Sequence, residues 1–189
     1  METWIPPLMV AVLMSMFAFS QKSDSLVAEK PVPGTFRDPR IVIRKEQRIL
    51  EAYEGEVLKK TYAVALGFAP SGDKETEGDG KTPEGEFYVF TKNTQSKFHL
   101  SIGVSYPSKD DAERGFEKGL ITKSEREAII SAIDAKKTPP QKTKLGGEIY
   151  IHGGGTGRDW TWGCVALQNA DIDELFAAIP VGTKVTVVP

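Results

Sequence analysis

The chain has 189 residues, enough for one domain with a substantial hydrophobic core. Hydrophobic residues make up 40% of it and charged residues 26%, which is a globular composition and excludes an intrinsically disordered chain. Lys and Arg together number 24 and nearly balance the 26 Asp and Glu residues. There is no basic excess to grip a phosphate backbone, so we expect no nucleic-acid partner.

The first twenty residues differ from the rest of the chain. The run Leu8 to Phe19 is almost wholly apolar, and the small residues Ala18 and Ser20 precede a suitable cleavage point before Gln21. We therefore predict that residues 1–20 are a signal peptide, and that the protein is exported to the periplasm or cell envelope. No Lys or Arg precedes the run, and the alternatives are an uncleaved N-terminal membrane anchor or a buried segment.

A polar stretch at residues 21–39, with prolines at 31 and 33, predicts a linker ahead of a folded domain at residues 40–188. Within that domain, short runs of β-branched and aromatic residues alternate with turn residues, which predicts strands. The expected strands are 41–43, 47–53, 57–66, 86–91, 98–104, 148–151 and 183–188. Residues 70–85 are rich in Gly, Asp and Pro and predict a surface loop.

Two segments predict helices. Ser124 and Glu127 have the spacing of a capping box, and isoleucines at helical spacing follow them, which predicts a helix from Ser124 to about Ala135. Asp171 to Glu174 predicts the start of a second helix, which Gly182 ends. The expected fold class is therefore mainly β with flanking helices (α+β), built as a β-sandwich or barrel.

The segment IHGGGTGRDWTWGC at residues 151–164 holds the only cysteine of the chain, Cys164, and one of its two histidines, His152. A lone cysteine in an exported chain cannot form an internal disulfide. It is an intermolecular link, an inert buried thiol or a reactive one. A reactive thiol needs a base, and a histidine at a strand end is suited to that task. On these residues alone, catalysis and a purely structural cysteine both stay open.

Other kinds of site find little support. One cysteine and two histidines without paired spacing lack the ligands of a closed zinc site. The chain has neither a GxxxxGK[ST] motif nor a GxGxxG motif that opens a helix, so a phosphate-binding loop is not expected. We therefore predict no metal and no cofactor.

The sequence around Cys164, IHGG…TWGCVALQNADIDEL, resembles the active-site segment of the L,D-transpeptidase catalytic domain (YkuD) family. GKTPEGEF at 80–87 is similar to the TPxGxF segment of that family, and GTKVTV at 182–187 is similar to its closing strand. These motifs follow the order of the family and span about residues 40–188. The WTWGC variant at 160–164 resembles the YafK-like murein L,D-transpeptidase branch.

The resemblance implies roles for four residues. Cys164 matches the nucleophile and His152 the general base. Gly153 matches the residue whose backbone carbonyl helps to hold the imidazole. Gly163 and Cys164 match the positions whose N–H groups stabilise the oxyanion.

The sequence also departs from the family pattern. Trp162 stands where relatives usually have a second histidine, and Ala166 stands where an arginine often follows the cysteine. We expect Trp162 and Trp160 to wall the pocket, with core packing as the alternative for either. Tyr106 and His99 are weaker candidates for lining the substrate groove.

The activity that the resemblance implies is that of a peptidoglycan-acting cysteine acyltransferase in cell-wall remodelling. Cys164 would form a thioester with a stem peptide and pass it to an amine or to water. The implied partners are peptidoglycan stem peptides and, as one acceptor, a lipoprotein, and the expected state is a monomer. The alternatives are an L,D-carboxypeptidase or amidase, a non-catalytic peptidoglycan-binding module of the same fold, and a disulfide-linked dimer through Cys164.

Overall fold

A computed structural model describes residues 1–2 and 34–189 of the chain. The expected signal peptide or anchor at 1–20 lies outside the described residues except for the first two, and so does most of the expected linker. The last residues of that linker are folded, because the Phe36 N–H donates to the Ala178 carbonyl at 3.0 Å and the Asp38 carbonyl accepts from the Gly55 N–H at 3.0 Å. Within the described ranges, no helix has the length and apolar character needed to cross a membrane.

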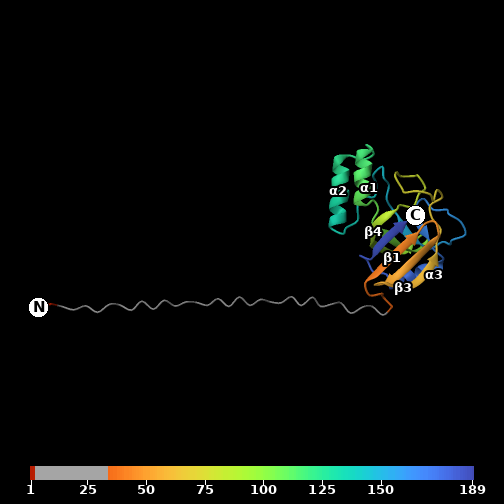
Figure 1. Cartoon of the computed structure of the whole chain (residues 1–189), viewed down its shortest axis with the longest axis horizontal. Helices are drawn as coiled ribbons and strands as arrows, with labels where there is room; N and C mark the ends of the chain where they lie inside the picture. Colours follow the sequence, from red (N-terminus) through yellow and green to blue (C-terminus); the bar gives the residue numbers. More distant parts are fainter. Residues whose placement is uncertain (3–33) are drawn as a thin grey trace. The chain divides into compact units, whose positions relative to one another are not determined.

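One sheet of eight strands, curled into a half-barrel, forms the body of the folded domain (Figure 1). The strands lie in the order β3-β2-β1-β8-β4-β5-β6-β7. Their bounds are β1 (Pro39–Arg44), β2 (Ile49–Glu54), β3 (Val57–Ala63), β4 (Gly85–Ser96), β5 (His99–Val104), β6 (Tyr150–His152), β7 (Val165–Ala166) and β8 (Lys184–Val188). The mainly β fold class with flanking helices is confirmed, and the sheet takes the form of a curled half-barrel.

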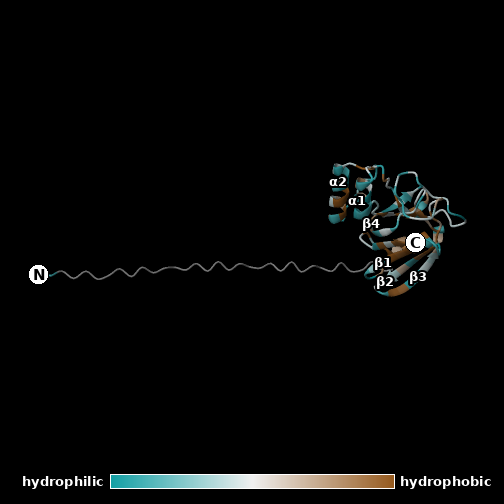
Figure 2. Cartoon of the chain, turned by 45° about the horizontal axis from the view of Figure 1, so that its top comes forward, coloured by the Kyte–Doolittle hydropathy of each residue, from teal (hydrophilic) through white to brown (hydrophobic). Residues whose placement is uncertain are grey.

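The closing strand β8 joins the two halves of the sheet. It pairs parallel to β1, with Ile41 opposite Val185, and antiparallel to β4, with Phe87 also opposite Val185. All three residues are buried. Alternate residues of a strand share a face, so the β-branched runs that predicted strands also supply the core. Figure 2 shows hydrophobic residues gathered along the strands.

The other half of the sheet carries the segment around Cys164. β4 and β5 form a hairpin, and β5 pairs with β6 so that Ser101 lies opposite His152. β6 in turn pairs parallel with the short strand β7, where His152 lies opposite Ala166. The parallel pairing of these two strands brings both ends of the IHGGGTGRDWTWGC segment side by side.

Within residues 34–189, three helices accompany the sheet: α1 (Lys109–Glu117), α2 (Lys123–Asp134) and α3 (Asn169–Ala178). α3 contributes Ile172 and Leu175 to the main core. α1 and α2 form a helical pair (Figure 1) with a smaller core of their own, which consists of Ala112, Ile121, Ile129 and Leu145.

The helix starts differ from the sequence predictions. α1 was not predicted, although Ser108 and Asp111 form a capping box in front of it. α2 begins earlier than expected because Thr122, rather than Ser124, caps it through the Glu125 N–H. α3 begins at Asn169, two residues before the expected start, and has no side-chain cap.

Candidate active site

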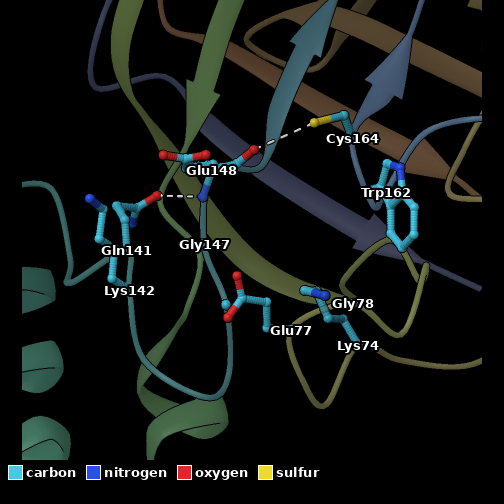
Figure 3. A pocket seen from close by; sticks show the side chains of 10 residues that line it. Lys74, Glu77, Gly78, Gln141, Lys142, Gly147, Glu148, Trp162 and Cys164 are labelled. Carbon is cyan, nitrogen blue, oxygen red and sulfur yellow. Dashed lines mark hydrogen bonds between the residues drawn. The ribbon is translucent and has the colours of Figure 1, made fainter.

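Cys164 lies immediately before β7 and lines a cavity of about 530 Å³. The side chain is partly buried, and the cavity opens in front of it (Figure 3). Four charged residues and one tryptophan are among the other lining residues: Lys74, Glu77, Lys142, Glu148 and Trp162. The cavity is thus mixed in charge and large enough to hold a segment of a peptide.

The thiol is held by the start of β6. Its Sγ donates to the Glu148 carbonyl at 3.5 Å (Figure 3) and accepts from the Tyr150 N–H at 3.4 Å. Burial raises the pKa of the Cys164 thiol to about 11, against the opposing effects of the Tyr150 N–H and the Lys74 charge. At neutral pH the resting group is therefore a thiol, and it needs a base to become a nucleophile.

His152, at the end of β6, has the properties of such a base. Its Nδ1 lies 2.6 Å from the Gly153 carbonyl oxygen, which is the contact that the family resemblance implies. A carbonyl only accepts hydrogen bonds, so Nδ1 carries the proton and Nε2 is left to accept one. Burial lowers the pKa of the imidazole below its ordinary value of 6.5, so His152 is neutral at pH 7.

The strand pairing places the thiol and the imidazole near each other. His152 lies opposite Ala166 on the neighbouring strand, and Cys164 is two residues before Ala166. Residues two apart share a face and lie roughly 6–7 Å apart along a strand. Among the described residues, no hydrogen bond joins the Cys164 thiol to the His152 imidazole. The thiol must therefore turn away from the Glu148 carbonyl to reach Nε2.

Aromatic rings enclose the imidazole. The Phe98 ring is stacked on it with centroids 4.7 Å apart, and the Trp160 ring meets it edge-on at 5.6 Å. His152 is only 3% exposed as a result. The expectation that Trp160 walls the cavity of Cys164 is wrong. Trp160 lines a second hollow beside the 154–158 loop, where its Nε1 donates to the Gly155 carbonyl.

Trp162, in contrast, does line the cavity of Cys164. It is 70% exposed, and its ring meets Phe68 in a T-shaped contact with centroids 4.9 Å apart. Trp162 therefore forms part of the cavity wall and is not a core residue.

The two glycines next to the reactive residues are held by close backbone contacts. A Cβ on Gly163, whose φ is +124°, would lie 2.7 Å from the Lys81 carbonyl oxygen. The Gly163 N–H is already bound to the Thr161 hydroxyl at 3.2 Å, so it is not a free donor for an oxyanion in this structure. Gly153 admits the Phe98 carbonyl, which would lie 2.8 Å from an added Cβ. Of the two expected oxyanion donors, the Cys164 N–H remains.

The two weaker candidates lie away from the cavity. Tyr106 is fully buried, and its hydroxyl donates to the Leu145 carbonyl at 2.9 Å, so it is a core residue and does not line the cavity of Cys164. His99 begins β5 on the surface, and its Nε2 lies 2.7 Å from an Asp173 carboxylate oxygen on α3. It therefore links the β4–β5 hairpin to that helix.

Two positioning residues were missed from the sequence. Asp159 accepts from the Arg48 guanidinium at 2.8 Å and from the Leu66 N–H at 2.8 Å, and so fixes the loop before Trp160. Gln141 accepts from the Glu148 N–H at 2.7 Å and so supports the peptide that holds the thiol. Arg48 and Asp159 are 111 residues apart in sequence, so no local pattern could have predicted their contact.

Asp159→Ala is expected to lower the free energy of unfolding by roughly 1–3 kcal/mol, because the Leu66 N–H and the Arg48 guanidinium lose their shared acceptor. Urea unfolding followed by circular dichroism measures the change. Asp134→Ala is the matched control, because its ion pair with Lys109 is exposed and contributes at most about 1 kcal/mol. Equal losses in the two variants would contradict the anchoring role of Asp159.

Comparisons with known proteins agree with this architecture. The sequence model of the L,D-transpeptidase catalytic domain matches residues 38–187. A Bacillus subtilis (strain 168) protein, which carries the provisional name L,D-transpeptidase YqjB, is 29% identical over 166 residues, covering 85% of this chain and 76% of that protein.

Two solved structures are similar in fold. The helical cell shape determining protein Pgp2 from Campylobacter jejuni superposes with a TM-score of 0.54 at 22% identity, over 80% of this chain and 48% of that one. Bd1075 from Bdellovibrio bacteriovorus superposes with a TM-score of 0.52 at 23% identity, over 81% of this chain and 48% of that one. The chain thus spans about half the length of each.

Proposed function

The chain belongs to the L,D-transpeptidase catalytic domain family, and on that premise we propose that it is a peptidoglycan-acting cysteine acyltransferase. Its substrate would be a stem peptide, attacked at the carbonyl of its third, diaminopimelate-type residue, so that the bond after this residue breaks. The stem peptide forms a thioester with Cys164 and is then passed to an amine or to water. Export to the periplasm or cell envelope is part of the proposal, because peptidoglycan lies outside the cytoplasm.

One observation carries this proposal. The only cysteine of the chain, Cys164, lines a cavity of about 530 Å³. On the neighbouring strand, the neutral imidazole of His152 lies opposite Ala166, two residues after Cys164, and its Nε2 is unprotonated. A nucleophile, a base and room for a peptide are the parts that acyl transfer through a thioester requires.

The first half of the reaction makes the acyl-enzyme. The Cys164 thiol leaves the Glu148 carbonyl and gives its proton to Nε2 of His152. The thiolate attacks the substrate carbonyl carbon, and the Cys164 N–H stabilises the oxyanion that forms. As the C–N bond breaks, the imidazolium returns its proton to the leaving amine. The Gly153 carbonyl accepts from Nδ1 throughout and favours the charged imidazolium.

The second half releases the acyl group. An acceptor amine or a water molecule gives a proton to Nε2 and attacks the thioester carbonyl. The C–S bond then breaks, and the departing Cys164 thiolate takes up the proton from His152. An amine acceptor gives a cross-link or an attached lipoprotein, whereas water gives hydrolysis.

The fold likeness to Pgp2, a cell-shape determining protein, supports a place for this activity in cell-wall remodelling. We include a contribution to cell shape in the proposal for that reason. Microscopy of cells with the protein deleted, and then complemented with the wild type, would test this part separately.

Purified muropeptides with tetrapeptide stems test the proposed function. Incubation with and without an amine acceptor, followed by mass spectrometry, distinguishes the products. A cross-linked dimer that requires the acceptor indicates transpeptidation, and a shortened stem without it indicates hydrolysis. The absence of both products and of any Cys164 adduct would reject the enzyme and favour a peptidoglycan-binding module.

A further inference from the structure

We propose that Phe98 is a positioning residue for His152: its ring covers the imidazole, keeps water away from it and holds it against the Gly153 carbonyl. The inference rests on the proposed function in so far as His152 acts as the base of Cys164. It assigns the task of preparing that base to a residue of the β4–β5 hairpin.

The ring contacts carry the proposal. Phe98 and His152 are stacked at 4.7 Å with an angle of 25° between their planes, and Trp160 lies 5.5 Å from Phe98 and 5.6 Å from His152. His152 is 3% exposed, whereas Phe98 is 44% exposed. The side chain that shields the imidazole thus stands between it and the solvent.

The hairpin fixes Phe98 in that place. Ser96 pairs with His99, so Lys97 and Phe98 form the tip of the hairpin, and the Phe98 N–H donates to the Ser96 hydroxyl at 3.1 Å. The Phe98 carbonyl packs against Gly153, and the Gly153 N–H donates to the Leu100 carbonyl at 3.3 Å, so the tip lies against the end of β6. A β-strand register and a backbone contact, rather than a mobile side chain alone, therefore determine where the ring lies.

The charged groups next to Phe98 and Trp160 in the sequence pair with other partners or are exposed. On the hairpin tip, His99 pairs with Asp173 of α3. In the loop after β6, Asp159 pairs with Arg48. Lys97 of the tip and Arg158 of the loop are exposed. The remaining charged or titratable groups on α3, β6 and the β7 segment are Asp171, Glu174, Tyr150 and Cys164.

Removal of the ring has two expected effects. Solvent would reach the imidazole, and because burial lowers the pKa of His152, that pKa should rise toward its ordinary value of 6.5. The imidazole would also gain rotational freedom, so that Nε2 meets the thiol less often. A purely structural role for Phe98 would produce neither effect.

Three variants test the proposal: Phe98→Ala removes the ring, Phe98→Leu keeps an apolar cover without a flat face, and Phe116→Ala is the matched control. Phe116 is 40% exposed, lies on α1 and is remote in sequence from the site. The chain has only two histidines, so NMR titration of the imidazole C–H signals resolves His152 once His99→Ala has assigned the other. The rate of Cys164 alkylation by iodoacetamide is measured against pH in parallel.

In Phe98→Ala, we expect the His152 titration midpoint and the acid limb of alkylation to move upward together by about half a pH unit or more. At pH values above the acid limb, the rate of Cys164 alkylation should fall by about tenfold relative to the wild type. For Phe98→Leu, the His152 midpoint and the alkylation rate should lie between those of the wild type and Phe98→Ala. For Phe116→Ala, both quantities should match those of the wild type.

An unchanged His152 midpoint in Phe98→Ala, or an equal shift in Phe116→Ala, would overturn the proposal. The titration does not depend on turnover. A wild-type protein that processes no muropeptide would therefore count against the proposed function, and the NMR result would still decide the role of Phe98.

Discussion

Cys164→Ala is expected to abolish acyl transfer, with muropeptide turnover falling by roughly 10⁴-fold or more, into the uncatalysed background. The variant removes the atom that forms the thioester, and the chain has no second cysteine to replace it. His152 can still activate a water molecule, but no covalent intermediate can form. Intact-mass spectrometry during turnover should show an acyl adduct on the wild type and none on the variant.

The fold should survive this substitution. The Sγ makes only long contacts, at 3.4 and 3.5 Å, with the Tyr150 N–H and the Glu148 carbonyl. We therefore expect the thermal unfolding midpoint of Cys164→Ala to stay close to that of the wild type. Cys164→Ser is the matched variant, since it keeps the shape and a hydrogen-bond donor but loses the thiolate. Retained turnover in Cys164→Ala would refute the covalent mechanism.

The resting state of the site follows from burial. The thiol has its pKa raised to about 11 and the imidazole has its pKa lowered, so both are neutral at pH 7. A protonated thiol reacts slowly with oxidants and alkylating agents. Reactivity then depends on the movement of the thiol from the Glu148 carbonyl to Nε2 of His152, which substrate binding in the cavity can favour.

The sequence was sufficient to single out Cys164 and His152 as candidate site residues but not to predict their surroundings. Cys164 and His152 stand out because each is rare in the chain and both lie in a glycine-rich segment. Phe98 and Gln141 do not, because their contacts depend on the register of β5 with β6 and on the path of the loop before β6. Tyr106 was misjudged for the same reason: only tertiary packing places its hydroxyl on the Leu145 carbonyl.

The fold shows the same division between local and long-range information. Seven of the eight strands were predicted, because runs of β-branched and aromatic residues are a local pattern, as in β1, β4 and β8, whereas the two-residue strand β7 was missed. α1 was missed because it is short and contains Gly115, and only three of its residues are buried. The parallel pairing of β8 with β1 joins residues more than 140 positions apart, and no local pattern encodes it.

His152→Ala is expected to slow thiol alkylation and acyl transfer at pH 7 by about 10²–10⁴-fold, the usual contribution of general-base catalysis. In the wild type, the rate should rise with pH through the pKa of His152, which lies below 6.5, because only the neutral imidazole accepts the thiol proton. In the variant this limb should vanish. The rate should then rise only as the thiol ionises by itself, towards its pKa of about 11.

His99→Ala is the matched control, because it removes the other histidine of the chain from an exposed pair with Asp173. It should keep the wild-type acid limb, since its Nε2 contacts the Asp173 carboxylate at 2.7 Å on the surface and its strand is not paired with β7. A wild-type limb in His152→Ala, or its loss in His99→Ala, would contradict the assignment of the base. Trp162 occupies the position of a possible second histidine and has no proton acceptor, so nothing there can replace the lost imidazole. The pH profile of His152→Ala should therefore be that of an unassisted thiol.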